Sequence, residues 1–260
     1  MNIRELLEFH ATGDWSEPHV RATWASDRRR RVPDVEALID AAWARASARP
    51  GVHLFDGPMC RLERWAATAD DLRLELSPTT YKAFLGTNLS HPELADRYGR
   101  DVLANPVGVS PALVTADGWL MMGRRNDSVA YYPRRVHPFA GALDPTDASP
   151  FAAVRRELRE ELSLAEDEVT GVRCTGIAED RSIRQPELIF AARTTVTRAE
   201  LEHRLDATEH HGAWAAPATA AGVETALASG EAFTPVAVAA LVLWGRVAFG
   251  EGWFAGMTDR

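Results

Sequence analysis

Residues 156–164 read Arg-Glu-Leu-Arg-Glu-Glu-Leu-Ser-Leu, and this stretch decides the fold. It places Glu157, Glu160 and Glu161 three and four positions apart, so a helix would present them on one side. Apolar residues at the same spacing mark the side that packs: Phe151, Val154, Leu158 and Leu162. Crowded carboxylates repel one another unless a cation lies between them, and Mg²⁺ or Mn²⁺ prefers such oxygen ligands. The alternative is a solvated helix face on which Arg156 pairs with Glu160.

The segment before this helix predicts a β-hairpin followed by a loop. Apolar runs at 112–115 and 119–125 flank an Asp117-Gly118 step, which is a strong hairpin signal. Residues 138–145 read Pro-Phe-Ala-Gly-Ala-Leu-Asp-Pro and are rich in turn formers. The predicted order is therefore a hairpin, a glycine loop, and a helix that carries a carboxylate cluster.

That order resembles the Nudix hydrolase family. The family motif is a glycine, a spacer, a glutamate, a second spacer, and then Arg-Glu-apolar-x-Glu-Glu-x-Gly-apolar. The positions that match it are Gly141, Arg156, Glu157, Leu158, Glu160, Glu161 and Leu164. The charged core of the motif is therefore retained.

The chain departs from the family motif at two positions. Ser163 stands where the closing glycine is expected. The glutamate between Gly141 and Arg156 is absent, and Asp147 or Ala148 falls there instead. The motif is also one residue longer than its common form. These departures bear on how the metal-binding carboxylates are positioned.

The resemblance implies an α/β/α sandwich fold and a metal-dependent hydrolysis. Water would attack a phosphorus of a nucleoside diphosphate linked to another group, and the pyrophosphate bond would break. Glu157, Glu160 and Glu161 are the expected ligands of Mg²⁺ or Mn²⁺. Arg156 is expected to orient one of these glutamates rather than to touch the substrate.

The general base is left open at this point. It is one of the three glutamates or a carboxylate on a later segment, for which Glu187 and Glu209 are candidates. Arg124 and Arg125 end the predicted hairpin near the Gly141 loop, and one of them is expected to contact a phosphate. Gly141 and Glu187 are also expected near the substrate. For each charged candidate the alternative is an ordinary surface role.

Length and composition agree with an ordinary enzyme. The chain has 260 residues, of which 46% are hydrophobic, and a formal net charge of -8 that argues against a general nucleic-acid binder. Its two cysteines, Cys60 and Cys174, make neither a disulfide framework nor a zinc site. No secretory signal segment and no apolar run of about 18 residues is present, so a cytoplasmic location without membrane contact is expected.

We expect residues 1–105 to form an N-terminal α+β extension packed on a Nudix domain of residues 106–260, which ends in a helix. In the extension, the patterns predict a helix at 34–48 with Asp34 as N-cap, then paired strands at 60–65 and 72–76, the second of which ends at Ser77-Pro78. A short helix containing Tyr81 and Phe84 follows. In the second part, the patterns predict strands at 169–178 and 187–196 and a helix from Pro235 to Trp244 that faces Leu241 and Val242 inward.

Parts of this extension resemble the UDP-sugar hydrolase branch of the Nudix family. The segments that follow the pattern of that branch are Trp43-Ala44-Arg45, Pro50, Leu54-Phe55-Asp56-Gly57, Arg61-Leu62, and Tyr81 to Asn88. The branch also has an elongated motif, as this chain does. The resemblance covers scattered segments between about residues 43 and 195 and implies a UDP-sugar substrate, such as UDP-glucose or UDP-galactose, cleaved to UMP and a sugar 1-phosphate.

The segment Gly86-Thr87-Asn88 is interpreted as a turn that faces this substrate. Glycine allows the backbone to approach a ligand closely, and Asn88 offers a donor and an acceptor to a uracil edge or to sugar hydroxyls. The alternative is a structural turn in which Asn88 caps its own backbone.

Other functions stay open from the sequence. One is a pyrophosphatase for another nucleotide, such as ADP-ribose or a CDP-linked compound. A second is a catalytically inactive Nudix-fold module that binds a nucleotide, which Ser163 and the missing glutamate favour. Whether the chain forms a homodimer is also open.

Overall fold

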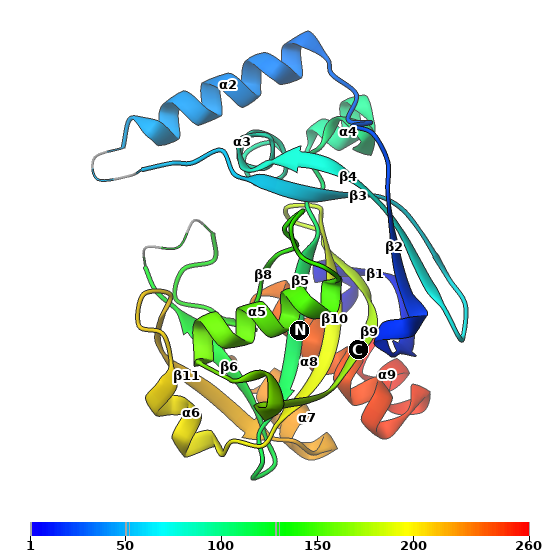
Figure 1. The fold of residues 1–260 in the computed structure, drawn as a ribbon, viewed down its shortest axis with the longest axis vertical. Helices are drawn as coiled ribbons and strands as arrows, with labels where there is room; N and C mark the ends of the chain where they lie inside the picture. The colour runs from blue at the N-terminus through cyan, green and yellow to red at the C-terminus, as the bar shows by residue number, and fades with distance from the viewer. Residues whose placement is uncertain (1, 50, 52, 128, 130, 260) are drawn as a thin grey trace.

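The computed structural model describes residues 2–49, 51, 53–127, 129 and 131–259; Pro50, one of the residues of the resemblance, lies outside them. Among the described residues, one large sheet has eight strands in the order β1-β9-β10-β5-β6-β11, with β7 paired to β6 and β8 to β5 (Figure 1). The strands are β1 (Leu7–Trp15), β5 (Gly108–Val114), β6 (Trp119–Arg125), β7 (Val136–His137), β8 (Gly141–Ala142), β9 (Val169–Asp180), β10 (Gln185–Thr194) and β11 (His210–Pro217).

Helices cover both faces of the large sheet. On one face, α5 (Pro150–Leu162) buries Phe151, Val154 and Leu158 against a core that includes residues of β5, β9 and β10. On the other face, α8 (Pro235–Phe249) buries Leu241 and Val242 in a second core. The other helices of this half of the molecule are α1 (Ile3–Leu6), α6 (Arg198–Arg204), α7 (Ala220–Ala228) and α9 (Glu251–Thr258). The α/β/α sandwich expected from the sequence is therefore confirmed.

Strands β5 and β6 pair only beside their connecting turn and then separate. Their register joins Leu113 to Met121 and Val114 to Leu120. Beyond that point, Gly141 of β8 pairs with Val109 of β5, and His137 of β7 pairs with Gly123 of β6. The separated parts of β5 and β6, with β8 paired to one and β7 to the other, form a fork in the sheet. The loop that leads to α5 enters this fork and brings Gly141, the first residue of the motif, into the middle of the fold.

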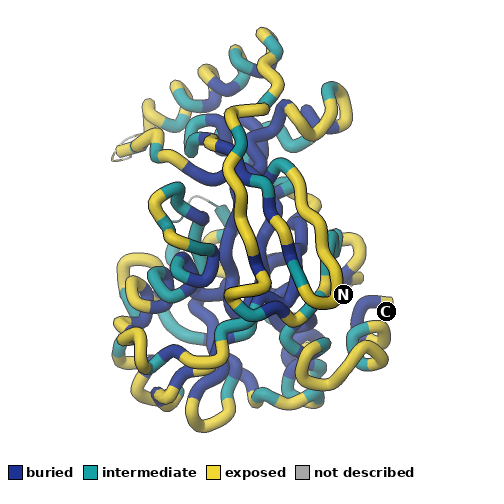
Figure 2. Tube along the Cα trace, turned by 45° about the vertical axis from the view of Figure 1, so that its right-hand side comes forward, coloured by how far each residue is buried: buried dark blue, intermediate teal, exposed yellow. Residues whose placement is uncertain are grey.

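The N-terminal half carries a second, three-stranded sheet. Its strands, in spatial order, are β2 (Val20–Trp24), β4 (Leu72–Thr80) and β3 (Pro58–Ala67). The helical segments of this half are η1 (Glu17–His19), α2 (Pro33–Ser47), α3 (Tyr81–Phe84), η2 (Leu85–Leu89), α4 (Leu94–Tyr98) and η3 (Arg100–Val102). One further short helix, η4 (Glu166–Glu168), follows α5 in the other half. Figure 2 shows that buried residues concentrate in the large sheet, whereas much of α2 and of the three-stranded sheet is exposed.

Most predicted elements are present, with two corrections at their ends. Helix α2 begins at Pro33 and its N-cap is Val32, so Asp34 lies in the first turn rather than at the cap. Strand β4 does not end at Ser77 but continues through Pro78 to Thr80. Its neighbour β2 stops pairing at Leu76, so Pro78 lies where β4 has an open side and its missing N–H costs no ladder bond.

Strand β1 departs from the division of the chain that the sequence suggested. It lies within residues 1–105, yet it pairs with β9 at the edge of the large sheet, for example Leu7 with Asp180. The N-terminal half thus contributes both a separate sheet and an edge strand to the half that holds the motif. None of the described helices has the length and apolar character needed to cross a membrane.

Candidate active site at the fork of the sheet

Glu157 of α5 points into the fork against Gly141 of β8. Its side chain is buried, with 8% of the residue exposed. A Cβ atom at position 141 would stand 2.0 Å from Glu157 Oε1, so only glycine leaves room for this carboxylate. The opening glycine of the motif therefore creates the space that one of its glutamates occupies.

Arg156 fixes the position of Glu157. Its Nη1 donates to Glu157 Oε1 at 2.6 Å, and its Nη2 donates to the backbone oxygen of Ala142 at 3.1 Å. Nε and Nη2 also donate to the two carboxylate oxygens of Asp147, each at 3.1 Å. Asp147 thus provides a carboxylate partner for Arg156 at one of the two positions where the motif lacks its glutamate.

Glu161 lies one turn further along α5 and contacts His210 of β11. Glu161 Oε2 and His210 Nε2 share a short hydrogen bond. One ligand atom from each of Glu161, His210 and Glu209 lies within 4.8 Å of the other two. Glu161 Oε1 is buried and has no hydrogen-bond partner of normal geometry among the described residues. A carboxylate oxygen left in this way beside a second carboxylate and an imidazole is the donor set that a divalent cation suits.

A second glycine makes room for His210. A Cβ at Gly123 of β6 would stand 2.2 Å from His210 Nδ1. The ring of Phe139 meets the same imidazole edge to face, with 5.4 Å between ring centroids. His210 is therefore held in a narrow slot from which it reaches Glu161.

Glu160 is placed differently from the other two glutamates. It is exposed, and its Oε2 accepts a bond from Arg156 Nη1 at 3.3 Å. Glu157 and Glu161 are four residues apart and border the packed side of α5, whereas Glu160 lies toward solvent. The three glutamates expected on one open face are thus two buried carboxylates and one exposed carboxylate.

Burial changes the acidity of these groups. Desolvation raises the pKa of Glu157 to about 7, with Arg156 opposing the shift and Glu161 adding to it. Desolvation also raises the pKa of Glu161 well above its usual range, and the charge of Glu209 adds to this effect. Burial lowers the pKa of His210. A bound cation would reverse the cost of ionising both glutamates, because it supplies the missing positive charge.

Glu187 forms a separate buried carboxylate on β10. Its Oε2 accepts a bond from Ser110 Oγ at 3.1 Å, and a Cβ at Gly108 would stand 2.0 Å from that oxygen. Desolvation raises the pKa of Glu187 to about 8, while the hydroxyl of Ser110 counteracts the shift. Glu187 is therefore buried, and the ordinary surface role that was the alternative for this residue is wrong. It also lies outside the cluster of Glu161, Glu209 and His210.

The two arginines at the end of β6 have different surroundings. Arg124 forms a bidentate pair with Glu231, at 3.0 and 2.7 Å. Arg125 pairs with no carboxylate among the described residues, and its guanidinium lies 5.0 Å from the ring centroid of Tyr131. Its charge opposes part of the rise in the pKa of both Glu161 and Glu187. Arg125 rather than Arg124 is therefore the cation that faces the site.

The segment Gly86-Thr87-Asn88 lies in a helix, η2, and not in a turn. A Cβ at Gly86 would stand 2.5 Å from Ile39 Cα, so this glycine permits close packing on α2. Thr87 and Asn88 are fully buried. Asn88 Nδ2 donates to the backbone oxygens of Ile183 and Arg184, at 3.0 and 3.1 Å.

The acceptor group of Asn88 is also engaged within the protein. Its Oδ1 accepts from the backbone N–H of Asn105 at 3.0 Å and from the hydroxyl of Thr87 at 3.2 Å. The Thr87 hydroxyl in turn accepts from the N–H of Ala104 at 3.0 Å. These contacts favour a structural role for Asn88 over contact with a substrate. Its hydrogen bonds go mainly to backbone groups that are distant in sequence, and not to its own backbone as a cap would.

Ser163 ends α5 in the left-handed region, with φ 51° and ψ 33°. This conformation explains why the motif has glycine here, since a side chain makes it unfavourable. The backbone N–H of Ser163 still donates to Arg159 O at 2.9 Å, so the helix ends as it would with glycine. Serine in place of the motif's glycine therefore makes this helix end less favourable in energy but leaves its shape unchanged.

Some residues of the site were not identified from the sequence. His210 was not among the predicted site residues, and Asp147 was expected only as one of two residues that fall where the motif has its glutamate. The sequence at 208–217 does not alternate clearly between polar and apolar residues, so it gave little signal for the strand β11 that carries His210. Which strand would reach Glu161 depends on sheet order, and periodicity does not give sheet order.

The chain is similar to several known proteins. The NUDIX domain model matches residues 105–234. The chain is 31% identical over 209 residues to the bovine protein named uridine diphosphate glucose pyrophosphatase NUDT22, covering 65% of this chain and 71% of that protein. The mouse and human proteins of the same name are 36% and 37% identical, over 45% of this chain.

The mouse and human alignments span 42% and 44% of those proteins, which is less than half of their length. Among solved structures, the Deinococcus radiodurans protein DR0079 aligns with a TM-score of 0.41 and 20% identity, over 52% of this chain and 80% of that chain.

Proposed function

Because this chain belongs to the Nudix family, we propose that it hydrolyses the pyrophosphate bond of a UDP-sugar, giving UMP and a sugar 1-phosphate. UDP-glucose is the first candidate substrate, on the ground of the relatives' name, and UDP-galactose is the second. The observation that carries the hydrolase assignment is the hydrogen bond between buried Glu161 and His210, one helical turn from a second buried carboxylate, Glu157.

Mg²⁺ or Mn²⁺ is the proposed cofactor. Glu161, Glu209 and His210, whose ligand atoms lie within 4.8 Å of one another, would hold it, and Glu157, whose pKa the charge of Glu161 raises, would add a further carboxylate oxygen. The cation would supply charge neutralisation at the phosphates and a more acidic bound water. Glu160 lies at the exposed margin of α5, where it would contribute through a water or a second ion.

The protein's own groups have distinct tasks in this reaction. Arg156 holds Glu157 in place, and Asp147 holds Arg156, so both act as positioning residues. Arg125 offers a guanidinium to a phosphate oxygen. The attacking water forms a new P–O bond, the bridging P–O bond breaks, and the released protons go to a carboxylate and then to solvent. Glu161, hydrogen-bonded to His210, is the proposed first acceptor of a proton.

Glu187 and Asn88 have indirect roles in this proposal. Glu187 lies near Arg125 and Tyr131 and sets the electrostatic environment on that side of the site. Asn88 positions the turn at 183–184 by its two backbone bonds. Neither residue needs to touch the substrate for this effect.

The inactive binding module is the less favoured alternative. It was supported by Ser163 and by the missing glutamate, yet Ser163 takes the left-handed conformation and Asp147 pairs with Arg156. A pure binding role also gives no reason to bury Glu157 and Glu161 beside each other. A pyrophosphatase for ADP-ribose or a CDP-linked compound remains the second candidate function, because the carboxylate site is common to all these substrates.

The test is a hydrolysis panel with UDP-glucose, UDP-galactose, ADP-ribose and a CDP-linked compound. The expected result is release of UMP and sugar 1-phosphate with Mg²⁺ or Mn²⁺, and no turnover with EDTA. Turnover of ADP-ribose ahead of every UDP-sugar would assign the second candidate function. Absence of turnover on every substrate would leave the binding module.

A further inference from the structure

A cavity of about 310 Å³ lies between the N-terminal helices and the half that holds the carboxylates. One side is formed by α2 and η2, and the other by residues 131–132 and 182–183. Arg45 and Arg49 are its cations, and Tyr131 and Tyr132 are its aromatic residues. This volume is at the lower end of the range for small-molecule sites, so it suits one nucleoside rather than a whole dinucleotide.

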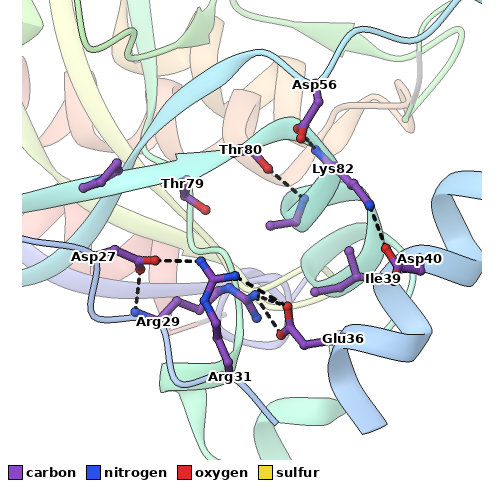
Figure 3. A pocket seen from close by; sticks show the side chains of 12 residues that line it. Asp27, Arg29, Arg31, Glu36, Ile39, Asp40, Asp56, Thr79, Thr80 and Lys82 are labelled. Carbon is purple, nitrogen blue, oxygen red and sulfur yellow. Dashed lines mark hydrogen bonds and ion pairs between the residues drawn. The ribbon is translucent and has the colours of Figure 1, made fainter. Parts of the chain in front are cut away.

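A second pocket on α2 provides the contrast (Figure 3). Its volume is about 330 Å³, and each of its cations is paired with a carboxylate. The pairs are Arg29 with Glu36, Arg31 with Asp27, and Lys82 with Asp40. Because each cation there already has a carboxylate, the pocket in Figure 3 offers no donor set that awaits a ligand.

Arg45 and Arg49 differ in this respect. Both are exposed residues at the solvent side of the 310 Å³ cavity, and neither forms an ion pair with a carboxylate among the described residues. Ala42 and Ala46 lie on the same side of α2 and take little space between them. The guanidinium groups are donors with no acceptor capacity, so they select a ligand that presents acceptors.

Tyr131 is the residue that the cavity shares with the surroundings of Arg125. This side chain lines the cavity, and the guanidinium of Arg125 lies 5.0 Å from the centre of its ring. Phe84 supports the same ring edge to face, at 6.3 Å between centroids. A substrate with its phosphates at Arg125 would therefore extend one of its ends past Tyr131 into the cavity.

We propose that this cavity binds the uracil end of the substrate, with Arg45 and Arg49 donating hydrogen bonds to the carbonyl oxygens of the base. The proposal rests on the proposed function. Uracil presents two carbonyl oxygens on its edge, which match two donor-only side chains. Adenine presents ring nitrogens as acceptors beside an amino group that is a donor, so its acceptors are arranged differently and fit two donors placed for the uracil oxygens less well.

The experiment measures UMP binding to the full chain by calorimetry, in EDTA, so that the readout does not depend on turnover. The variants are Arg45→Ala, Arg49→Ala and their double variant. Arg159→Ala, an exposed arginine on α5, is the matched control for the loss of one positive charge. AMP and glucose 1-phosphate are the comparison ligands, and circular dichroism checks that each variant is folded.

The double variant is expected to weaken UMP binding by about tenfold or more, while Arg159→Ala does not. Glucose 1-phosphate binding should be unchanged. In turnover of UDP-glucose the loss should be in KM and not in kcat, and Arg45→Lys should retain more affinity than Arg45→Ala.

Unchanged UMP affinity in the double variant would overturn the assignment. So would loss of glucose 1-phosphate binding with UMP unaffected, because the cavity would then hold the sugar. These outcomes are distinct from failure of the proposed function, in which the wild-type protein does not hydrolyse UDP-glucose. A wild type that hydrolyses UDP-glucose yet has a double variant with normal UMP binding refutes the cavity assignment alone.

Discussion

The carboxylate of Glu157 occupies the space beside Gly141 in which a side chain at position 141 would begin. The same relationship recurs between Gly123 and His210 and between Gly108 and Glu187. In each case a glycine on a strand of the fork lies against a buried titratable group. The shape of the site is therefore set by missing side chains as much as by present ones.

The first prediction concerns this space. Gly141→Ala would place a Cβ 2.0 Å from Glu157 Oε1, so the carboxylate must move. We expect kcat/KM to fall by about tenfold or more, because small displacements of a catalytic group are costly. Steady-state kinetics would measure the fall. Gly256→Ala is the control, since nothing lies within 4 Å of its Cβ, and it should leave activity unchanged.

The second prediction separates the two kinds of glutamate on α5. Glu161→Gln removes the charge from a buried carboxylate hydrogen-bonded to His210 and should reduce kcat by about a hundredfold or more. Glu160→Gln, at an exposed position, should have a smaller effect. Mn²⁺ binding followed by electron paramagnetic resonance should weaken in the first variant. Equal losses in both variants would contradict the division into buried and exposed carboxylates.

The third prediction compares the neighbouring arginines of β6. Arg125→Ala should lower kcat/KM by about a hundredfold, because a guanidinium facing the phosphates is lost. Arg124→Ala breaks a partly exposed pair with Glu231 and should cost about 1 kcal/mol of unfolding free energy or less, with activity retained. Steady-state kinetics would measure kcat/KM of both variants, and urea unfolding would measure their unfolding free energy. The reverse pattern would place Arg124 at the phosphates.

The fourth prediction uses pH. The folded-state pKa of Glu187 is raised to about 8 by burial, above its unfolded value, so the folded protein keeps a proton that the unfolded chain releases. This proton favours the folded state most at low pH, and the benefit is lost as pH rises toward 8. Glu187→Gln should therefore gain stability relative to wild type between pH 5 and pH 8, on the order of a few kcal/mol.

Urea unfolding at both pH values, with EDTA present, would measure this difference. Glu166→Gln, at an exposed carboxylate, is the control and should leave the pH dependence of wild type unchanged. The prediction is contradicted if the difference in unfolding free energy between wild type and Glu187→Gln is the same at pH 5 and pH 8. Glu187 would then be ionised in the folded protein at both pH values.

The fifth prediction concerns the end of α5. Ser163→Gly relieves a left-handed conformation, with φ 51°, that a side chain makes unfavourable. The added flexibility of glycine in the unfolded chain offsets part of the gain, so we expect about 1 kcal/mol of added stability. Thermal unfolding would measure it. A loss of stability would mean that the serine side chain makes a compensating contact.

The sequence predicted the secondary structure around the motif well because the local signals agree there. The Asp117-Gly118 turn, the alternating strands and the apolar side of the helix each specify one element, and the structure has β5, β6 and α5 in those places. It did not predict β1 in the large sheet, because strand pairing between Leu7 and Asp180 leaves no trace in either segment alone.

The site was predicted in part for the same reason. Glu157 and Glu161 follow from helical spacing, but their burial follows from Gly141 and from β11, which lie far away in the sequence. Asn88 looked like a ligand contact because it follows Gly86 and Thr87. Its four hydrogen bonds within the protein depend on residues 87, 105, 183 and 184, most of which no local pattern could bring to it.

The pairing of β1 with β9 has a consequence for how the chain reaches its folded state. During synthesis, Leu7 and Phe9 leave the ribosome long before Ala178 and Asp180, the residues with which they pair. The large sheet thus has high contact order at its edge, and closing it is a slow step. Until then β9 presents an open edge to other chains, so loss of β1 should make the protein prone to aggregation.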